Sequence, residues 1–206
     1  MTRPRRRALL PILAALFMAA PLLPAHATPF GHIRDGSVVS ANAGWGWTRI
    51  RLAGGSDTVP ADLETDHEDA FGGMLRYGFA PSDGLMYGVQ LGGWKKTFDG
   101  DTATLFFFEG FGTWFPREGG FFVRGAIGWG SLDLTLRRPF AELRNVTFQE
   151  GGISLGGGIG YELRLQADFA LGLAFDGHWV DIGDFADLRD VRAVNYLLSL
   201  NFAYYL

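Results

Sequence analysis

The stretch that decides the fold is residues 152–163, which read Gly-Ile-Ser-Leu-Gly-Gly-Gly-Ile-Gly-Tyr-Glu-Leu. Apolar side chains recur at every second position, and glycine, serine and glutamate fill most of the positions between them. A period of two is that of a β-strand, whereas an amphipathic helix repeats every three to four residues. The stretch therefore predicts a strand with one apolar face and one small or polar face.

The same alternation recurs along the rest of the chain, and no window after residue 35 shows a helical period. It is clear over residues 39–48, 71–79, 85–92, 152–163, 169–176 and 194–206. Residues 104–115 and 121–131 fit less cleanly, because both faces of 104–115 are apolar. A β-bulge would account for a shift of phase there. The pattern predicts eight strands of about 10–12 residues, the length that a tilted strand needs to cross a bilayer.

The connections between these strands alternate in length. Short turns are expected at 80–84, 116–120 and 164–168, and longer polar loops at about 53–69, 95–103, 132–149 and 181–190. Such alternation predicts an all-β, eight-stranded, antiparallel up-and-down transmembrane barrel. In bacterial outer-membrane barrels the short turns are periplasmic and the long loops face outward. Both chain ends would then be periplasmic.

The first 27 residues have the three regions of a cleavable signal peptide. Four arginines (Arg3, Arg5, Arg6, Arg7) precede an apolar run over residues 8–24, and Ala25-His26-Ala27 has the small-x-small form of a cleavage site. The alternative is a retained transmembrane helix, but the run contains three prolines and is shorter than the roughly 20 apolar residues that a span needs. We expect cleavage after Ala27 and a barrel domain over residues 28–206.

Composition narrows the function classes. The chain has 18 Lys and Arg and 22 Asp and Glu, and the signal holds four of the basic residues and none of the acidic ones. The remainder has a net charge of −8, which argues against nucleic acid, since that ligand requires a basic face. The absence of cysteine excludes disulfides and thiolate chemistry. Thirty glycines and 15% aromatic residues are unusual for a soluble domain.

The two faces of the strands differ in a way that predicts which face lines the lumen and which face contacts lipid. The aromatic and aliphatic set looks too bulky for the narrow interior of an eight-stranded barrel, so we expect it to face lipid and the glycine-rich polar set to face the lumen. Buried charges must be paired, and the polar face carries enough of both signs. A packed structural network is favoured, and a narrow solute channel is the alternative. The predicted lumen network consists of Arg76, Gln90, Glu109, Arg124, Glu162, Asp176 and His178.

Aromatic residues gather at the predicted strand ends, where amphipathic rings are stable at headgroup depth. Trp94 breaks the phase of its strand and is a candidate to point inward. The predicted interfacial aromatics are Trp45, Trp47, Trp114, Trp129, Trp179 and Tyr204.

Three features carry a resemblance to a known family. They are Trp114-Phe115-Pro116 before a short turn, the run 156–162, and a terminal alternating strand. On these features the chain resembles small outer-membrane barrels of the OmpA/OmpX type. The resemblance implies contact with outer-membrane lipid and lipopolysaccharide, and recognition of the last strand by the barrel-assembly machinery. Members usually end in an aromatic residue, whereas this chain ends in Leu206.

The family includes adhesins, stress proteins and small-solute channels, and we expect a monomeric protein with a structural or surface-interaction role. A catalytic role is disfavoured, because no serine lies near His178 in sequence. We expect no cofactor and no metal, since the acidic loop at 57–69 lacks calcium-loop spacing and reads as solvated. A soluble lipocalin-like barrel is the remaining alternative, suggested by Gly44-Trp45-Gly46-Trp47. It would keep an apolar lumen and usually adds a C-terminal helix.

Overall fold

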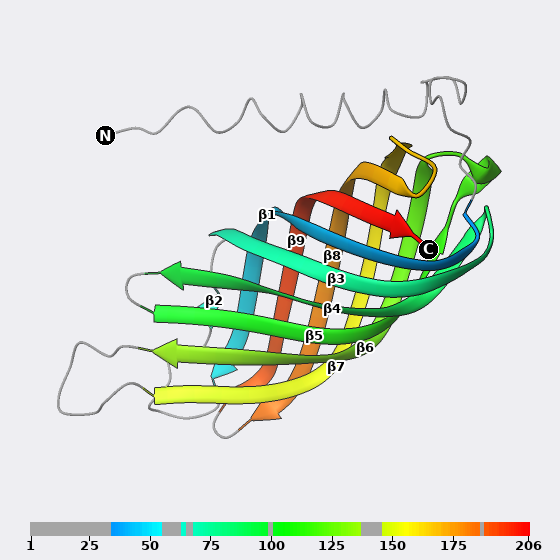
Figure 1. Cartoon of the computed structure of the whole chain (residues 1–206). Helices are drawn as coiled ribbons and strands as arrows, with labels where there is room; N and C mark the ends of the chain where they lie inside the picture. Colours follow the sequence, from blue (N-terminus) through cyan, green and yellow to red (C-terminus); the bar gives the residue numbers. More distant parts are fainter. Residues whose placement is uncertain (1–33, 55–62, 65–67, 99–100, 137–145, 186–187) are drawn as a thin grey trace, which may run out of the picture.

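The protein is a closed antiparallel β-barrel in a computed structural model, which describes residues 34–54, 63–64, 68–98, 101–136, 146–185 and 188–206 (Figure 1). Eight long strands form the wall, and a two-residue strand, β2, pairs with the end of β1. Within the described residues no helix is long and apolar enough to cross a membrane. The strands are β1 (Gly36–Gly54), β2 (Leu63–Glu64), β3 (Glu68–Ser82), β4 (Leu85–Phe98), β5 (Asp101–Trp114), β6 (Phe121–Leu136), β7 (Val146–Arg164), β8 (Phe169–Phe185) and β9 (Leu188–Tyr205).

The sheet closes because β1 pairs with both β3 and β9, while every other long strand pairs with its neighbours in sequence. In Figure 1, β1 (blue) and β9 (red) lie side by side. Following the Cα partners round the wall from Val38 leads back to β1 at Thr48, ten residues further along. This stagger tilts the strands, and eight strands leave an interior that side chains fill.

All eight predicted strands are present, but they are longer than the alternation indicated. They have 14 to 19 residues, and the pairing continues into the regions where long loops were expected. Most of 95–103 is a hairpin, because Phe98 pairs with Asp101. The loop was predicted from polar sequence, and this prediction was wrong because backbone hydrogen bonds between strands do not require apolar side chains. Parts of the four expected loops lie outside the described residues, namely 55–62, 65–67, 99–100, 137–145 and 186–187.

The predicted β-bulge in 104–115 is wrong. The register of β5 with β4 and with β6 runs without a shift, so both of its faces are apolar in a regular strand. Phe107 and Phe111 point inward and are at most 5% exposed. They fit because a glycine faces each ring: a Cβ on Gly92 would lie 2.7 Å from Phe107 Cζ, and one on Gly78 would lie 3.2 Å from Phe111 Cζ.

The expectation that the large rings all face outward was therefore only partly right. Small lumen residues on neighbouring strands make room for large ones, as close packing requires. The inward glycines serve the packing of these rings as well as closure of a narrow barrel.

The short turns lie at one end of the barrel, as predicted. Ser82 pairs with Leu85 across the first turn, and a 3₁₀ helix, η3 (Pro116–Glu118), forms the second. Phe115 N donates to Gly84 O at 2.9 Å, which holds these two turns together. Both Gly36 at the start of β1 and Tyr205 at the end of β9 lie at this same end, since Gly36 pairs with Ala80.

Candidate functional site

The inward side chains at the middle of the barrel form an ionic network around Asp176. Arg124 Nη1 lies 3.1 Å from Asp176 Oδ1, and Arg76 Nη2 lies 3.7 Å from the same oxygen. Asn42 Nδ2 donates a hydrogen bond of 3.3 Å to Oδ2. None of these four side chains is more than 7% exposed. Two guanidinium groups thus share one buried carboxylate.

Glu109, which is fully buried, contacts polar side chains from three other strands. Gln90 Nε2 donates to Oε2 at 2.5 Å, and Ser154 Oγ donates to Oε1. His178 Nδ1 lies 3.3 Å from both carboxylate oxygens. Phe107 stacks on the imidazole, with the ring centroids 4.2 Å apart. A single carboxylate therefore joins β5 to β4, β7 and β8 inside the barrel.

Arg76 links these two groups. Its Nε donates to Gln90 Oε1 at 2.9 Å, and its Nη1 donates to Asn201 Oδ1 at 3.3 Å. Six of the seven predicted lumen residues thus lie in one connected set, which we call the central polar layer. It consists of Asn42, Arg76, Gln90, Glu109, Thr113, Arg124, Ser154, Asp176, His178, Ser199 and Asn201.

Ser154 reaches the neighbourhood of His178, a proximity that sequence spacing did not indicate. A serine nucleophile needs a histidine nitrogen to accept its proton, with the carboxylate on the far side of the imidazole. Here the carboxylate of Glu109 lies between them, since Ser154 donates to it and the imidazole contacts it. The contacts of this trio are those of a buried carboxylate that accepts hydrogen bonds from its neighbours.

Glu162, the seventh predicted residue, lies apart from that layer at the short-turn end. Tyr205 Oη donates to its Oε1 at 2.8 Å, and Arg34 Nη2 lies 3.5 Å from the same oxygen. The Arg34 guanidinium covers the Phe115 ring at 3.5 Å from its centroid, and that of Arg164 covers Tyr205 at 3.6 Å. We call these five residues the short-turn cluster.

Sequence reasoning missed Arg34, which precedes β1. Besides its contacts in the cluster, its guanidinium donates to the backbone oxygens of Asp83 and Gly119 at 3.0 and 2.9 Å. It thereby joins the first residues before the barrel to two short turns. Alternation could not reveal it, because Arg34 lies outside the alternating stretch.

Two apolar layers flank the central polar layer. Along β5 the inward order is Leu105, Phe107, Glu109, Phe111 and Thr113, so an apolar side chain lies directly on each side of the carboxylate. The layer toward the long loops contains Ile50, Ala70, Met74, Trp94, Ala103, Leu105, Phe107, Leu132, Val180, Val191, Ala193 and Leu197. The layer toward the short turns contains Val38, Ala80, Met86, Phe111, Phe115, Phe122, Ala170, Ala174, Ala203 and Tyr205.

The outer face is apolar all round the wall. Each of the eight long strands presents large hydrophobic side chains that are 38–63% exposed. Among the predicted interfacial aromatics, Trp45, Trp114 and Trp129 are 58–59% exposed, and Tyr204 is 46% exposed.

Two further predicted aromatics, Trp47 and Trp179, are half-buried on the outer face. Trp94 points inward as predicted and is 2% exposed.

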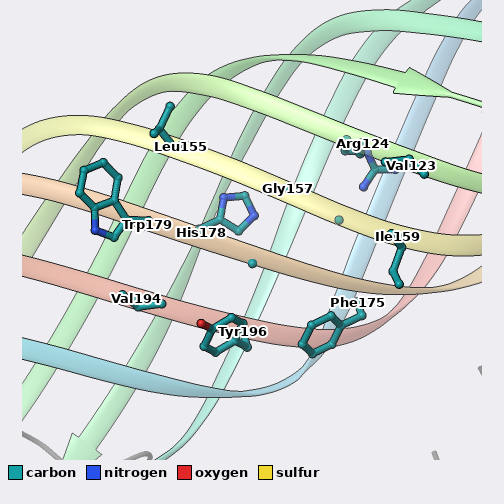
Figure 2. A pocket seen from close by; sticks show the side chains of 12 residues that line it. Val123, Arg124, Leu155, Gly157, Ile159, Phe175, His178, Trp179, Val194 and Tyr196 are labelled. Carbon is teal, nitrogen blue, oxygen red and sulfur yellow. The ribbon is translucent and has the colours of Figure 1, made fainter. Parts of the chain in front are cut away.

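A shallow depression of about 510 Å³ interrupts this outer face (Figure 2). Its floor is the backbone around Gly157 and Gly177, which are Cα partners on β7 and β8. Large side chains such as Phe175, Trp179 and Tyr196 form its rim. Gly157 also pairs with Gly125, and Gly125 with Gly112, so outward glycines continue across four strands. The walls carry no catalytic set.

The described residues contain no group of three or more His, Asp or Glu side chains placed to hold a metal ion. Most of the acidic loop at 57–69 lies outside the part of the chain that the structure describes.

The fold is a small eight-stranded antiparallel barrel, with a polar layer inside and an apolar outer wall. Among solved structures, Ail of Yersinia pestis in complex with the heparin analogue sucrose octasulfate is similar, with a TM-score of 0.56 and 12% identity. The match covers 82% of this chain and 99% of Ail. Neisserial surface protein A matches with a TM-score of 0.52 and 13% identity, over 84% of this chain and 98% of that one.

At these identities the likeness concerns the fold alone. No protein-family model matches this chain, and no curated protein sequence matches it.

Proposed function

We propose that this chain is an integral outer-membrane barrel that acts through its long-loop end, in surface interaction or envelope integrity. The observation that carries the proposal is the reversal of the two faces. A layer of charged and polar side chains crosses the lumen between two apolar layers, whereas the outer wall is apolar on every long strand. Soluble monomers rarely expose apolar patches above about 300–600 Å², and a belt round a whole barrel has no soluble counterpart.

Closure supports the membrane assignment. Lipid offers no hydrogen-bond partners, so a spanning sheet must have no free edge. Pairing of β1 with β9 removes that edge. A lipocalin-like ligand binder would keep its charged side chains on the outer wall, whereas here charged side chains cross the lumen and the outer wall is apolar.

The membrane assignment is tested by fractionation and electrophoresis. The full chain, expressed in a Gram-negative host, should fractionate with outer membranes. It should also migrate differently on a detergent gel before and after boiling, because a folded barrel stays compact until heated. Recovery as a periplasmic protein that needs no detergent would contradict the proposal.

We propose a structural role for the lumen, in place of a channel or an enzyme. Three stacked layers and the short-turn cluster fill the interior, and the charges are paired across strands. Paired and hydrogen-bonded charges are the form in which ionised groups are tolerated when buried. Specificity then belongs to the loops, which a rigid scaffold presents.

Export and assembly complete the proposal. We propose that residues 1–27 are removed by signal peptidase, so that N-terminal sequencing of the mature protein begins at Thr28. Both termini would be periplasmic, and the assembly machinery would read the outward aromatics of β9, including Phe202 and Tyr204. A Leu206→Phe variant should assemble at least as well as the wild type. Light scattering of the detergent-solubilised protein should report a monomer.

A further inference from the structure

The chain on both sides of the β1–β9 seam contacts one carboxylate at the short-turn end. Tyr205, the last residue of β9, donates from its hydroxyl to Glu162 Oε1 at 2.8 Å. Arg34, two residues before β1, places its Nη2 3.5 Å from the same oxygen. Glu162 belongs to β7, which pairs with β6 and β8 and with neither strand of the seam. Its carboxylate therefore links the two sides of the seam from inside the lumen, separately from the backbone hydrogen bonds between β1 and β9.

Arg34 reaches this position because the chain turns at Gly36. The φ of Gly36 is +84°, in the left-handed region that favours glycine, and a Cβ there would lie 2.6 Å from Leu206 O. Beyond this turn the Arg34 side chain is fully buried, whereas Asp35 is exposed. The guanidinium donates to the backbone oxygens of Asp83 and Gly119, so it is fixed by two short turns as well as by Glu162.

These contacts need both strands of the seam in place at the same time. The strand pairing at this end finishes at Val38 and Tyr205, and Leu206 N then donates to Ser37 O at 2.8 Å. If β9 separated from β1 here, the hydroxyl of Tyr205 would leave the Glu162 carboxylate. Glu162 is only 2% exposed, and a buried carboxylate that loses a donor is costly. The contacts inside the lumen therefore oppose opening of the seam.

We propose that Arg34, Glu162 and Tyr205 form a latch that locks the β1–β9 seam at the short-turn end. The latch engages as the last step of barrel closure, because it requires both strands to be paired already. An interaction that is absent from the folding transition state slows unfolding and leaves the folding rate unchanged. The inference concerns closure of the barrel and does not depend on the proposed membrane location.

The test detects opening of the seam through a single introduced thiol, since the chain contains no cysteine. Val38→Cys places the thiol inward at the seam, where Val38 is 1% exposed and pairs with Tyr205. Met86→Cys places it in the same apolar layer on β4, where Met86 is 5% exposed and lies away from the seam. The full chain, folded in detergent, is treated with a water-soluble maleimide, and the labelling rate is measured.

Arg34→Gln should raise the labelling rate of the Val38→Cys thiol at least about tenfold, the range of hydrogen bonds to charged groups. It should leave the Met86→Cys thiol protected. Tyr205→Phe, which removes only the hydroxyl, should also raise the rate at Val38→Cys. The increase in the Arg34→Gln/Tyr205→Phe variant should be smaller than the product of the two single increases, because both groups act through one carboxylate. The matched control is Glu118→Gln, which removes an exposed carboxylate at the same end and should change neither rate.

Four results would overturn the latch. They are an unchanged rate at Val38→Cys in Arg34→Gln, an equal increase at Met86→Cys, an equal increase in Glu118→Gln, and increases that multiply in the double variant. An equal increase at Met86→Cys would mean that Arg34 only covers the mouth of the barrel. If Arg34→Gln lacks the heat-dependent mobility of a folded barrel, Tyr205→Phe alone carries the comparison of the two thiols.

Folding kinetics test the order of events. Tyr205→Phe should speed unfolding in denaturant severalfold and leave the folding rate within about twofold of the wild type, as expected for a contact made after the transition state. A loss of stability that appears mainly as slower folding would contradict a latch that engages last.

Discussion

Each carboxylate at the centre of the lumen accepts hydrogen bonds from several strands, so removing it should weaken the contacts among all of those strands. Replacing Glu109 by Ala leaves Gln90, Ser154 and His178 without their acceptor. Breaking a buried ionic group by removing one partner costs about 3–5 kcal/mol. We expect that decrease in the free energy of unfolding of Glu109→Ala, measured by denaturant titration in lipid vesicles.

A control variant distinguishes the loss of a buried carboxylate from the loss of an exposed one. Glu118 is an exposed carboxylate on η3, and Glu118→Gln should change the free energy of unfolding by less than about 0.5 kcal/mol. Equal stability of Glu109→Ala and wild type would show that the central polar layer does not hold the strands together.

Adjacent glycines on β7 should respond in opposite ways to a large side chain. Gly158 points inward, where a Cβ would lie 3.1 Å from Asp176 Cγ, whereas the nearest atom to a Cβ on Gly157 is Arg124 O at 3.8 Å. We expect Gly158→Leu to abolish folding or to lower stability by about 1–3 kcal/mol or more, the cost of overpacking. Gly157→Leu should fold. The heat-dependent mobility of both variants on a detergent gel tests this, and the reverse order would contradict the assignment of faces.

At the scale of elements, β5 offers the sharpest test, because aromatic residues alternate on both of its faces. Phe107 is 2% exposed and packs on His178, whereas Phe108 is 53% exposed on the outer wall. Phe107→Ala creates a cavity and should cost about 3–5 kcal/mol of unfolding free energy. Phe108→Ala exchanges one lipid contact for another and should cost much less. Similar losses in the two variants would mean that β5 is not regular.

The existence of each strand followed from alternation, because a barrel wall between lipid and a packed lumen imposes a period of two. Strand ends did not follow, since the ladder continues past Lys95 into polar sequence and past Leu132 into the start of the expected loop. The inward position of Phe107 and Phe111 was hidden as well. Their inward position depends on which glycines of the neighbouring strands face them. The register that sets these neighbours cannot be read from the sequence of a single strand.

The candidate site was predictable to the same degree. Polar residues of the inward phase, such as Arg76 and Asp176, could be assigned to the lumen, but their pairing could not, because Asn42, Asp176 and Arg124 come from three strands. Glu162 belongs to a different cluster because of its position along the barrel axis. It lies opposite Gly172, four residues nearer the short turns than Asp176. The position of a residue along the barrel axis depends on the stagger of the strands, and that stagger is known only from the closed sheet.

At the scale of the whole molecule, the filled lumen predicts no ion conduction. Phe107, Glu109 and Phe111 are at most 5% exposed, so among the described residues all three layers that they represent are packed along β5. Purified protein in planar bilayers should give no conductance steps at voltages where a porin control does. Regular, voltage-independent steps would support the narrow-channel alternative and contradict the structural role of the lumen.

The pairing of β1 with β9 also has a consequence for biogenesis. Val39 lies opposite Tyr204, so nearly the whole described chain separates the two residues that complete the wall. Contacts of such high sequence separation form late and slowly. Until they form, the chain has two unpaired strand edges, which are templates for aggregation. With export as proposed above, we expect the nascent polypeptide to depend on a holdase chaperone until its last strand is delivered.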